Sequence, residues 1–252
     1  MRNFGHSGGS RPAGARDEAE SAAAVRAMFD TIAPKYDLLN HVLSCNVDRL
    51  WWWRTARRFR QALERSESKV LDICCGTGDM TLALLRRRPA TGEPVTAADF
   101  SPGMLARARV KLADKNARVM EADALRLPFA DGTLDLITTA FGFRNLANYD
   151  AGLREFFRVL APGGEMGILD FSEPGGLVGK MYAFYFRRVL PAIGARLTGA
   201  GGAYAYLPES VGNFPAPPAM LEMMRRAGFS DVSWTPYSFG IAGLWRGVKP
   251  RA

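Results

Sequence analysis

The stretch from Lys69 to Asp79, KVLDICCGTGD, constrains the fold more than any other part of the chain. Its short apolar run is long enough for one buried strand, and leucines at helical spacing follow the glycines Gly76 and Gly78. Glycine is needed where the backbone turns tightly and must come close to a ligand, because a Cβ atom would block both. The stretch therefore predicts a strand, a glycine turn and a helix, the arrangement with which α/β folds hold a nucleoside.

A second predicted strand, residues 95–98, ends in Asp99. In nucleotide-binding folds an acidic side chain about 20 residues beyond the glycine turn binds the ribose. A dinucleotide fingerprint would also place a pyrophosphate on the helix N-terminus, but here Asp79 begins the helix. A carboxylate at that point repels a pyrophosphate and suits a cationic ligand. Turn and cap chemistry is the alternative interpretation of Asp72 and Asp79.

The alternation of strands and helices continues along the chain. Strands are predicted over residues 117–120, 134–139 and 166–170, with helices between them, and a helix over 220–228 precedes a final hairpin of residues 232–238 and 241–248. This pattern predicts an α/β fold with a doubly wound, mostly parallel sheet, whose ligands lie at the carboxyl ends of the strands. The polar residues at or just beyond these predicted strand ends are Asp72, Asp99, Asp123, Arg144 and Asp170.

The N-terminal region precedes the first strand. Residues 1–20 lack hydrophobic periodicity and are predicted to be a disordered tail, whereas residues 21–66 have helical spacing and are predicted to cap the nucleoside cleft. Residues 21–252 are expected to form a single domain. Three consecutive tryptophans, residues 51–53, must point to different sides of a helix, so some belong to the core. The alternative is a nucleic-acid patch with the arginines that follow.

Composition limits the remaining possibilities. No apolar run reaches ~18 residues, so no membrane-spanning helix is expected, and three cysteines without a disulfide pattern suit a reducing cytoplasm. His6 and His41 are the only histidines, so no metal site is expected. The net charge is +8, which suits nucleic acid, an anionic membrane face or no particular partner. Residues 174–215 break the alternation of strands and helices with aromatic and basic residues, and they are predicted to be an insertion that faces the substrate or the membrane. A homo-oligomer is left open.

Several motifs carry a resemblance to a known family. They are MFDTIAPKYDLLN at 28–40, LDICCGTGD at 71–79, DFSPGML at 99–105, DALRLPFADGTLD at 123–135, FGFRN at 141–145, RVLAPGG at 158–164 and YLPESVGNFP at 206–215. Over residues 25–249 the chain resembles the C-methyltransferases of ubiquinone and menaquinone biosynthesis. The resemblance implies a class I methyltransferase fold with seven strands and S-adenosylmethionine as cofactor. The residues expected to bind this cofactor are Asp72, Gly76, Thr77, Gly78, Asp99, Asp123 and Ala124.

The resemblance also implies a reaction. The expected substrate is a polyprenylated quinol, mainly demethylmenaquinol, with the ubiquinone precursor, or both, as the alternative. Arg144 is expected to hold the phenolic oxyanion with Asn145 as hydrogen-bond donor, and water is expected to take the proton with help from Tyr36 or Asp37. A structural pair with a carboxylate of the cap is the alternative for Arg144. From other classes, an RNA-binding methyltransferase and a non-catalytic binding module stay open, although no nucleic-acid partner is expected.

The chain departs from the family pattern at three positions: Ala140, Asp170 and Trp245. A prenyl tail would keep the substrate in the bilayer, so peripheral contact of a cytoplasmic enzyme with the membrane is expected. The residues predicted to make that contact lie between Lys180 and Arg196, a segment rich in aromatic and basic side chains. A buried helix pair is the alternative for that segment.

Overall fold

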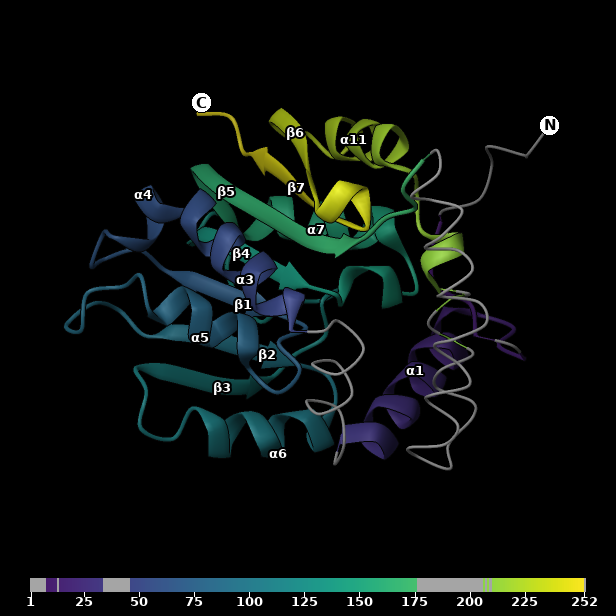
Figure 1. The fold of residues 1–252 in the computed structure, drawn as a ribbon, viewed down its shortest axis with the longest axis horizontal. Helices are drawn as coiled ribbons and strands as arrows, with labels where there is room; N and C mark the ends of the chain where they lie inside the picture. The colour runs from purple at the N-terminus through teal and green to yellow at the C-terminus, as the bar shows by residue number, and fades with distance from the viewer. Residues whose placement is uncertain are drawn as a thin grey trace.

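A seven-stranded sheet organises the computed structural model, which describes residues 8–12, 14–33, 46–175, 206, 208 and 210–251. The strand order is β3-β2-β1-β4-β5-β7-β6 (Figure 1). The strands are β1 (Val70–Ile73), β2 (Val95–Asp99), β3 (Ala117–Glu121), β4 (Leu134–Ala140), β5 (Leu160–Phe171), β6 (Ser230–Tyr237) and β7 (Ala242–Val248). β1 to β5 pair in parallel, and β7 runs antiparallel to both of its neighbours. The predicted fold class, including the antiparallel C-terminal hairpin, is confirmed.

The glycine-rich stretch forms the centre of the sheet. All four residues of β1 are buried between β2 and β4, as expected for an apolar strand in the middle of a parallel sheet. Gly78 follows with φ +96° and is the N-cap of α5 (Asp79–Leu85). Side chains of L-residues are strained in this left-handed region, so the turn into α5 requires glycine here. The strand, turn and helix predicted from the sequence are therefore all present.

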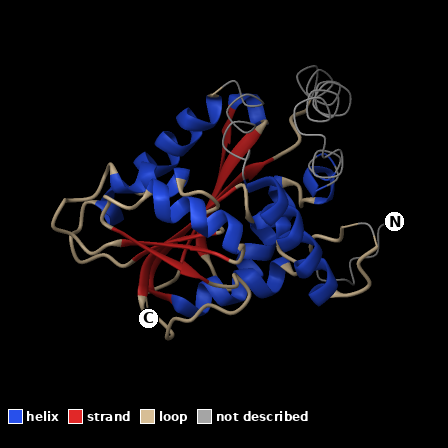
Figure 2. Ribbon diagram, turned by 90° about the horizontal axis from the view of Figure 1, so that it is seen from below, coloured by secondary structure: helices blue, strands red, loops and turns tan. Residues whose placement is uncertain are grey.

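Helices cover both faces of the sheet (Figure 2). One face is packed by α3 (Val47–Arg58), α4 (Arg60–Leu63), α5 and α6 (Pro102–Lys111), and the other by α7 (Tyr149–Val159) and α11 (Pro217–Arg226). Alternation along a strand separates the two cores: Leu244 of β7 packs on the α3 side, and Trp245 on the α7 and α11 side. Trp51 and Trp52 are buried in the core on the α3 side, and Trp53 is exposed. This confirms that the three tryptophans point to different sides of the helix.

The helix α1 (Glu18–Ile32) begins earlier than predicted, because Asp17 is its N-cap and accepts a hydrogen bond from the Glu20 N–H at 2.8 Å. The segment before it also contacts the body of the molecule. The Ser10 N–H donates to the Leu146 carbonyl at 2.7 Å, and the Tyr149 N–H donates to the Gly8 carbonyl at 2.8 Å. The tail predicted for residues 1–20 is therefore too long, since part of it has backbone partners that sequence periodicity cannot reveal.

The end of α7 also differs from the prediction. The strand was predicted over residues 166–170, after the proline and glycines at 162–164, but β5 starts directly after α7, at Leu160. Leu160 pairs with Leu134 of β4, and a register shift follows between Leu134 and Leu136. The proline and glycines of this stretch therefore form an irregularity inside the strand instead of a separate turn.

The C-terminal hairpin follows the predicted order, with the short turn η4 (Ser238–Gly240) between β6 and β7. No helix in the part of the chain that the structure describes is long and apolar enough to cross a bilayer. Most of the predicted insertion at 174–215, including Lys180 to Arg196, lies outside the described residues.

Candidate active site

A cavity opens at the carboxyl ends of β1, β2 and β4, where the sequence predicted a ligand site. Its empty volume, including the open mouth, is about 720 Å³, within the range of small-molecule sites. α1 covers it with Ala22 and Phe29. The other residues that line it include Cys74, Gly76, Asp99, Phe100, Met104, Asp123, Ala124, Leu125, Ala140, Phe141, Gly142 and Asn145. Of the cap predicted over residues 21–66, α1 therefore contributes to the cavity lining.

α1 is fastened to the sheet beside the cavity. Asp30 accepts hydrogen bonds from the Ser101 hydroxyl at 2.5 Å and from the Gly103 N–H at 3.0 Å, at the start of α6. A carboxylate at this position also suits the positive end of the helix dipole. Across the edge of the sheet, Arg26 of α1 pairs with Glu121 at 2.7 Å. These contacts hold Phe29 over the cavity.

Asp99 lies at the end of β2 with 6% of its surface exposed. One carboxylate oxygen accepts from the Gly76 N–H at 2.8 Å and the other from the Ser101 N–H at 2.9 Å. Burial raises the pKa of Asp99, and the hydrogen bonds from backbone N–H groups oppose that shift. Each carboxylate oxygen has a second lone pair, so Asp99 can accept further hydrogen bonds from two hydroxyls of a ligand in the cavity.

Asp72 has a different environment from the one its predicted role requires. Its carboxylate is completely buried and accepts from the Thr81 hydroxyl at 2.6 Å and the Thr138 hydroxyl at 3.0 Å. Burial raises the pKa of Asp72 to about 7. Asp72 is not among the residues that line the cavity. Its side chain ties β1 to α5 and β4, so we expect it to support the glycine turn from below and not to touch a ligand.

Thr77, Gly78 and Asp79 also lie away from the cavity lining. Lys111 of α6 donates to the Thr77 hydroxyl and pairs with the Asp79 carboxylate, each at 2.9 Å. Asp79 therefore has a cation within the protein, contrary to the expectation that it favours a cationic ligand. Asp99 and Asp123 take that role, because they are the charged residues among those that line the cavity, and both are acidic. Of the two glycines in the turn, Gly76 lines the cavity and Gly78 does not.

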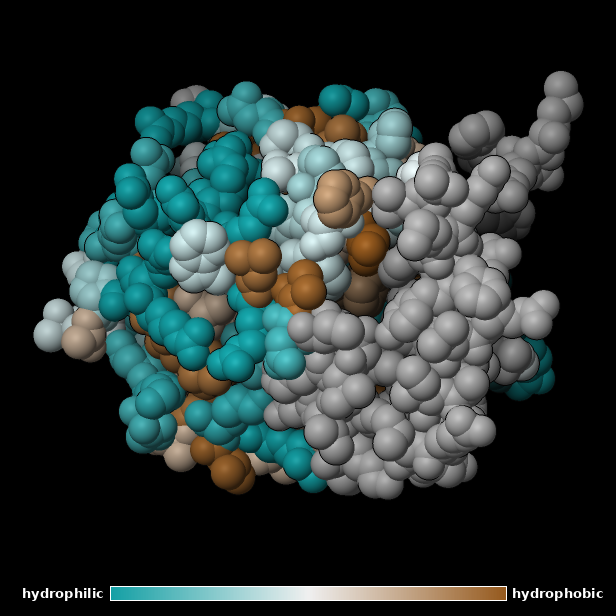
Figure 3. Space-filling view, in the orientation of Figure 1, coloured by the Kyte–Doolittle hydropathy of each residue, from teal (hydrophilic) through white to brown (hydrophobic). Residues whose placement is uncertain are grey.

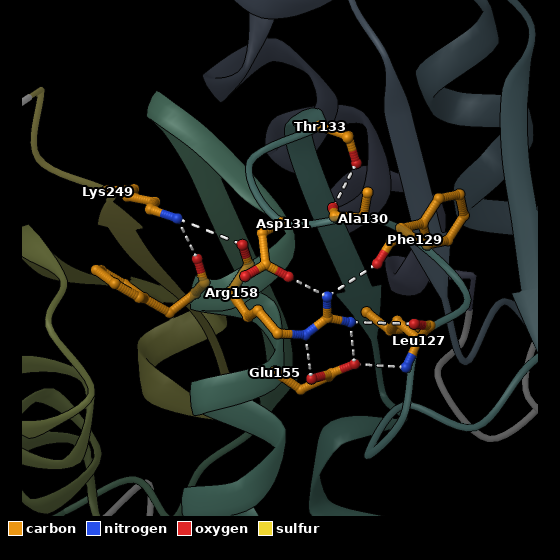
Figure 4. Close-up of polar contacts among 9 residues, drawn as sticks. Leu127, Phe129, Ala130, Asp131, Thr133, Glu155, Arg158 and Lys249 are labelled. Atoms are coloured by element: carbon orange, nitrogen blue, oxygen red, sulfur yellow. Dashed lines mark hydrogen bonds and ion pairs between the residues drawn. The ribbon is translucent and has the colours of Figure 1, made fainter.

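Asp123 and Ala124 belong to a loop that an arginine holds in place. Arg158 of α7 donates to the Leu127 carbonyl at 3.1 Å and to the Phe129 carbonyl at 2.9 Å, and pairs with Asp131 at 2.6 Å (Figure 4). Glu155, which pairs with Arg158 at 2.7 Å, also accepts from the Leu127 N–H at 2.6 Å (Figure 4). The loop after β3 is thus attached to α7 at several points, and this fixes the cavity wall that it carries.

Arg144 is placed beneath the cavity and not in it. It lies in η2 (Phe143–Asn145), is 6% exposed, and pairs with Asp170 at 2.9 Å. It also donates to the Phe141 carbonyl, and its backbone N–H donates to Asp170 at 3.1 Å. Burial raises the pKa of Asp170, and Arg144 opposes the shift. The ion-pair alternative therefore describes Arg144 better than a direct contact with substrate, although the partner belongs to β5 and not to the cap.

Asn145, the next residue, lines the cavity. Its amide oxygen accepts from the Tyr206 hydroxyl at 3.1 Å, and the same hydroxyl lies 2.6 Å from that of Ser10. Three segments that are distant in sequence therefore meet at this amide. Tyr36 and Asp37, the other two predicted catalytic residues, lie outside the described residues.

The wall opposite the carboxylates is apolar and closely packed. A Cβ atom at Gly142 would come within 2.3 Å of the Cys74 Cβ, so the FGFRN loop can lie against the glycine turn because it has glycine there. Burial raises the pKa of the Cys74 thiol well above its usual value, so the thiol is uncharged at neutral pH. Phe141 stacks 4.7 Å from Phe171, centroid to centroid.

This arrangement can bind a nucleoside through Asp99 and the loop at 123–125, and it presents an amide beside an apolar wall. Asp99, Asp123, Ala124, Gly76 and Asn145, which sequence reasoning assigned to the site, all line this cavity. That reasoning did not assign Phe29, Cys74, Phe100, Met104 or Phe141 to the site, although all five lie in motifs that carry the resemblance. Membership of these motifs could therefore have identified the uncharged residues that line the cavity.

Comparisons with known proteins agree with this geometry. Residues 16–249 match the model of the ubiE/COQ5 methyltransferase family. A demethylmenaquinone methyltransferase of Thermus thermophilus is 49% identical over 88% of this chain and 100% of its own length. The ubiquinone/menaquinone biosynthesis C-methyltransferase UbiE of Geobacter sulfurreducens is 42% identical over 91% of this chain and 90% of its own. A SAM-dependent methyltransferase structure from Aquifex aeolicus is similar in fold, with a TM-score of 0.53 at 19% identity over 74% of this chain and 84% of its own.

Proposed function

The chain belongs to the ubiE/COQ5 methyltransferase family, and from this premise we propose that it transfers a methyl group from S-adenosylmethionine to a ring carbon of demethylmenaquinol. The observation that carries the proposal is the single cavity that brings together Asp99, the 123–125 loop and Asn145. The higher identity to the relative named for demethylmenaquinone, 49% against 42%, favours the menaquinone substrate.

The cavity fits the proposed cofactor by its chemistry. S-adenosylmethionine, when bound, would supply a methyl group on a positively charged sulfonium. Asp99 would accept hydrogen bonds from the two ribose hydroxyls, and the backbone at Asp123 and Ala124 would contact the adenine. The charged residues of the described lining are two carboxylates, so the local field favours a cationic ligand. Thr77, Gly78 and Asp72 would shape the turn without touching the ligand.

Asn145 is the residue that we assign to the quinol. Its side-chain amide has two N–H donors, and the described contact with the Phe141 carbonyl, at 3.4 Å, engages the amide only weakly. A donor beside the quinol oxygen stabilises the negative charge that develops when the hydroxyl loses its proton and the ring carbon becomes nucleophilic. Tyr36 and Asp37 keep their proposed part in removing that proton.

Arg144 is then a positioning residue. Its ion pair with Asp170 fixes the FGFRN loop to β5, and its bond to the Phe141 carbonyl ties the loop to its own first residue. Positioning of this kind matters because a misplacement of about 1 Å can reduce a rate 10²-fold. The sequence-based proposal of a direct contact between Arg144 and the oxyanion is replaced by this indirect one.

The ubiquinone precursor is the second candidate substrate, because the relative at 42% identity is named for both quinones. The relatives described above are named for quinones and not for RNA. Peripheral contact with a membrane surface remains part of the proposal, because a polyprenyl tail would hold the substrate in the bilayer.

The reaction class is tested with S-adenosylmethionine that carries a ¹³C methyl group and a short-chain demethylmenaquinol. We expect a product whose labelled methyl signal is that of a methyl group on an aromatic carbon. An Asn145→Ala variant should bind the cofactor normally and turn over roughly 10²–10³-fold more slowly, the usual cost of losing one oxyanion donor. A label found on oxygen, or no label in the product, would contradict the proposal.

A further inference from the structure

The helix α3 has two faces of different chemistry. Trp51, Trp52 and their neighbours on the inner face are buried. On the outer face Leu50 and Trp53, one turn apart, are 50% and 45% exposed. The exposed side chains between and beyond them are arginines, at positions 49, 54, 57 and 58. The outer face of α3 is therefore apolar and basic, and it exposes no carboxylate.

The turn η4 adds an exposed aromatic ring beside this face. Phe239 is 87% exposed and has φ +59°, a left-handed conformation in which a bulky residue is strained. The turn is held against α3, because the Trp51 indole N–H donates to the Ser238 hydroxyl at 2.9 Å and the Arg54 guanidinium lies 4.4 Å from the centre of the Tyr237 ring. Neither the strain nor the exposure of Phe239 helps the protein to fold.

The charge around this face is positive. The Trp53 ring lies between two guanidinium groups, with Arg57 at 5.4 Å and Arg87 at 5.8 Å from its centre. Two of the nearby carboxylates have partners within the protein: Asp48 is buried and accepts from the Arg49 N–H at 2.7 Å, and Asp79 pairs with Lys111. Figure 3 shows hydrophobic atoms exposed over α3 and η4, bordered by hydrophilic ones.

An aromatic cluster joins this face to the cavity. The Trp51 ring lies 5.8 Å from that of Phe141 and 6.2 Å from that of Phe171. Phe141 also lines the cavity. A molecule with an apolar chain that entered from the α3 side would therefore meet apolar side chains from the surface to the cavity.

We propose that the outer face of α3 and the turn η4, with Leu50, Trp53 and Phe239 as apolar contacts and the surrounding arginines as cationic ones, dock on an anionic bilayer surface. Apolar side chains enter the boundary between headgroups and acyl chains while arginines meet anionic headgroups, which is the pattern of interfacial helices. This inference rests on the proposed function, because a prenylated quinol is presented at such a surface. It places a docking surface on α3, whereas the segment between Lys180 and Arg196, where the sequence predicted membrane contact, lies outside the described residues.

The charge contribution is tested with the Arg54→Glu/Arg57→Glu double variant in co-sedimentation with vesicles of phosphatidylglycerol and phosphatidylcholine. Each basic residue at the surface contributes about 1 kcal/mol, so loss of two should weaken partitioning at least ~30-fold at 1.4 kcal/mol per tenfold. The matched control is Arg225→Glu/Arg226→Glu on α11, which packs on the opposite face of the sheet. The control makes the same charge change and should reduce partitioning far less.

The apolar contribution is tested with Leu50→Ser/Phe239→Ser, which should weaken partitioning at least about tenfold, since insertion of half of each of the two side chains has that effect. Val110→Ser on α6 is the control, because Val110 is 81% exposed and belongs to a helix that packs on β2 and β3. Circular dichroism should show all variants folded, because each changed side chain is exposed.

Methyl transfer to a short-chain quinol without vesicles separates the two proposals. We expect the α3 and η4 variants to keep this activity and to lose activity on long-chain quinol in vesicles. Vesicle binding equal to the parent's in both double variants, or an equal loss in the α11 control, would overturn the docking surface and leave the proposed reaction intact. Binding to RNA that depends on Arg54 and Arg57, without binding to vesicles, would also overturn it. Failure of the parent to methylate the short-chain quinol would contradict the proposed function alone.

Discussion

Replacement of Asp72 by asparagine should change how the stability of this protein depends on pH. Asp72 is completely buried between Thr81 and Thr138, and burial raises its pKa from 3.8 to about 7. Asparagine has nearly the same shape and cannot ionise, and its amide can still form hydrogen bonds with both hydroxyls. The substitution therefore removes the ionisation of this group with little change in packing.

The sign of the effect follows from proton linkage. Between pH 3.8 and about 7 the folded protein holds a proton on Asp72 that the unfolded chain has lost. The free energy of unfolding consequently falls as pH rises, by about 1.4 kcal/mol for each pH unit. Over the whole window this amounts to about 4 kcal/mol, and above pH 7 the contribution is constant because both states are ionised. The Asp72→Asn variant should lack this fall.

Urea unfolding of the parent and the variant at several pH values measures the difference directly. The variant should gain stability relative to the parent as pH rises from 4 to 7, and the gain should then level off. Asp231→Asn, at an exposed carboxyl group, controls for the loss of one carboxylate. A stability difference that does not vary with pH would refute the argument that Asp72 is buried without a counter-charge. A large loss of cofactor affinity in Asp72→Asn would show instead that this side chain touches the ligand.

The other site residues give three further predictions. Asp99→Asn should weaken S-adenosylmethionine binding at least tenfold in calorimetry, because charge-assisted hydrogen bonds contribute about 1.5–3 kcal/mol each, and unchanged affinity would place the nucleoside elsewhere. Arg144→Ala should lower the free energy of unfolding by about 3–5 kcal/mol, because Asp170 would be left buried without its partner. A kcat reduced by roughly 10²–10³ with intact stability would support direct contact with the oxyanion instead. Arg158→Ala should weaken cofactor binding several-fold by releasing the loop at 127–131, whereas Arg154→Ala, at an exposed position of the same helix, should not; equal effects of the two would contradict the role of the Arg158 contacts.

Much of the fold was predictable because hydrophobic patterns are local. Each of the seven strands was predicted within a few residues except β5, whose start at Leu160 depends on pairing with Leu134 across the sheet. The early start of α1 depends on the Asp17 cap, and the backbone bonds of Gly8 and Ser10 join segments more than 130 residues apart. Such partners have no signature in the sequence near the residue itself.

In the site, too, some features could be predicted from the sequence and others could not. Asp99, Asp123 and Asn145 could be placed together because they follow parallel strands whose carboxyl ends meet at one edge. The direction in which a side chain points could not be predicted in this way. Arg144 and Asp72 also follow strands, but Arg144 turns toward Asp170 and Asp72 toward Thr81 and Thr138. A strand end brings a residue to the site, and the charge and hydroxyl groups of its neighbours decide whether it faces the ligand.

The most direct test of the proposed function is a competition between two quinols in one reaction. Demethylmenaquinol and the benzoquinol precursor of ubiquinone, with prenyl chains of the same length, would be offered together with labelled S-adenosylmethionine, and the ratio of labelled products gives the ratio of kcat/KM. We expect carbon-methylated menaquinol to be the main product, at least tenfold in excess. An excess of the methylated benzoquinol, or label in neither product, would contradict demethylmenaquinol as the substrate of this enzyme.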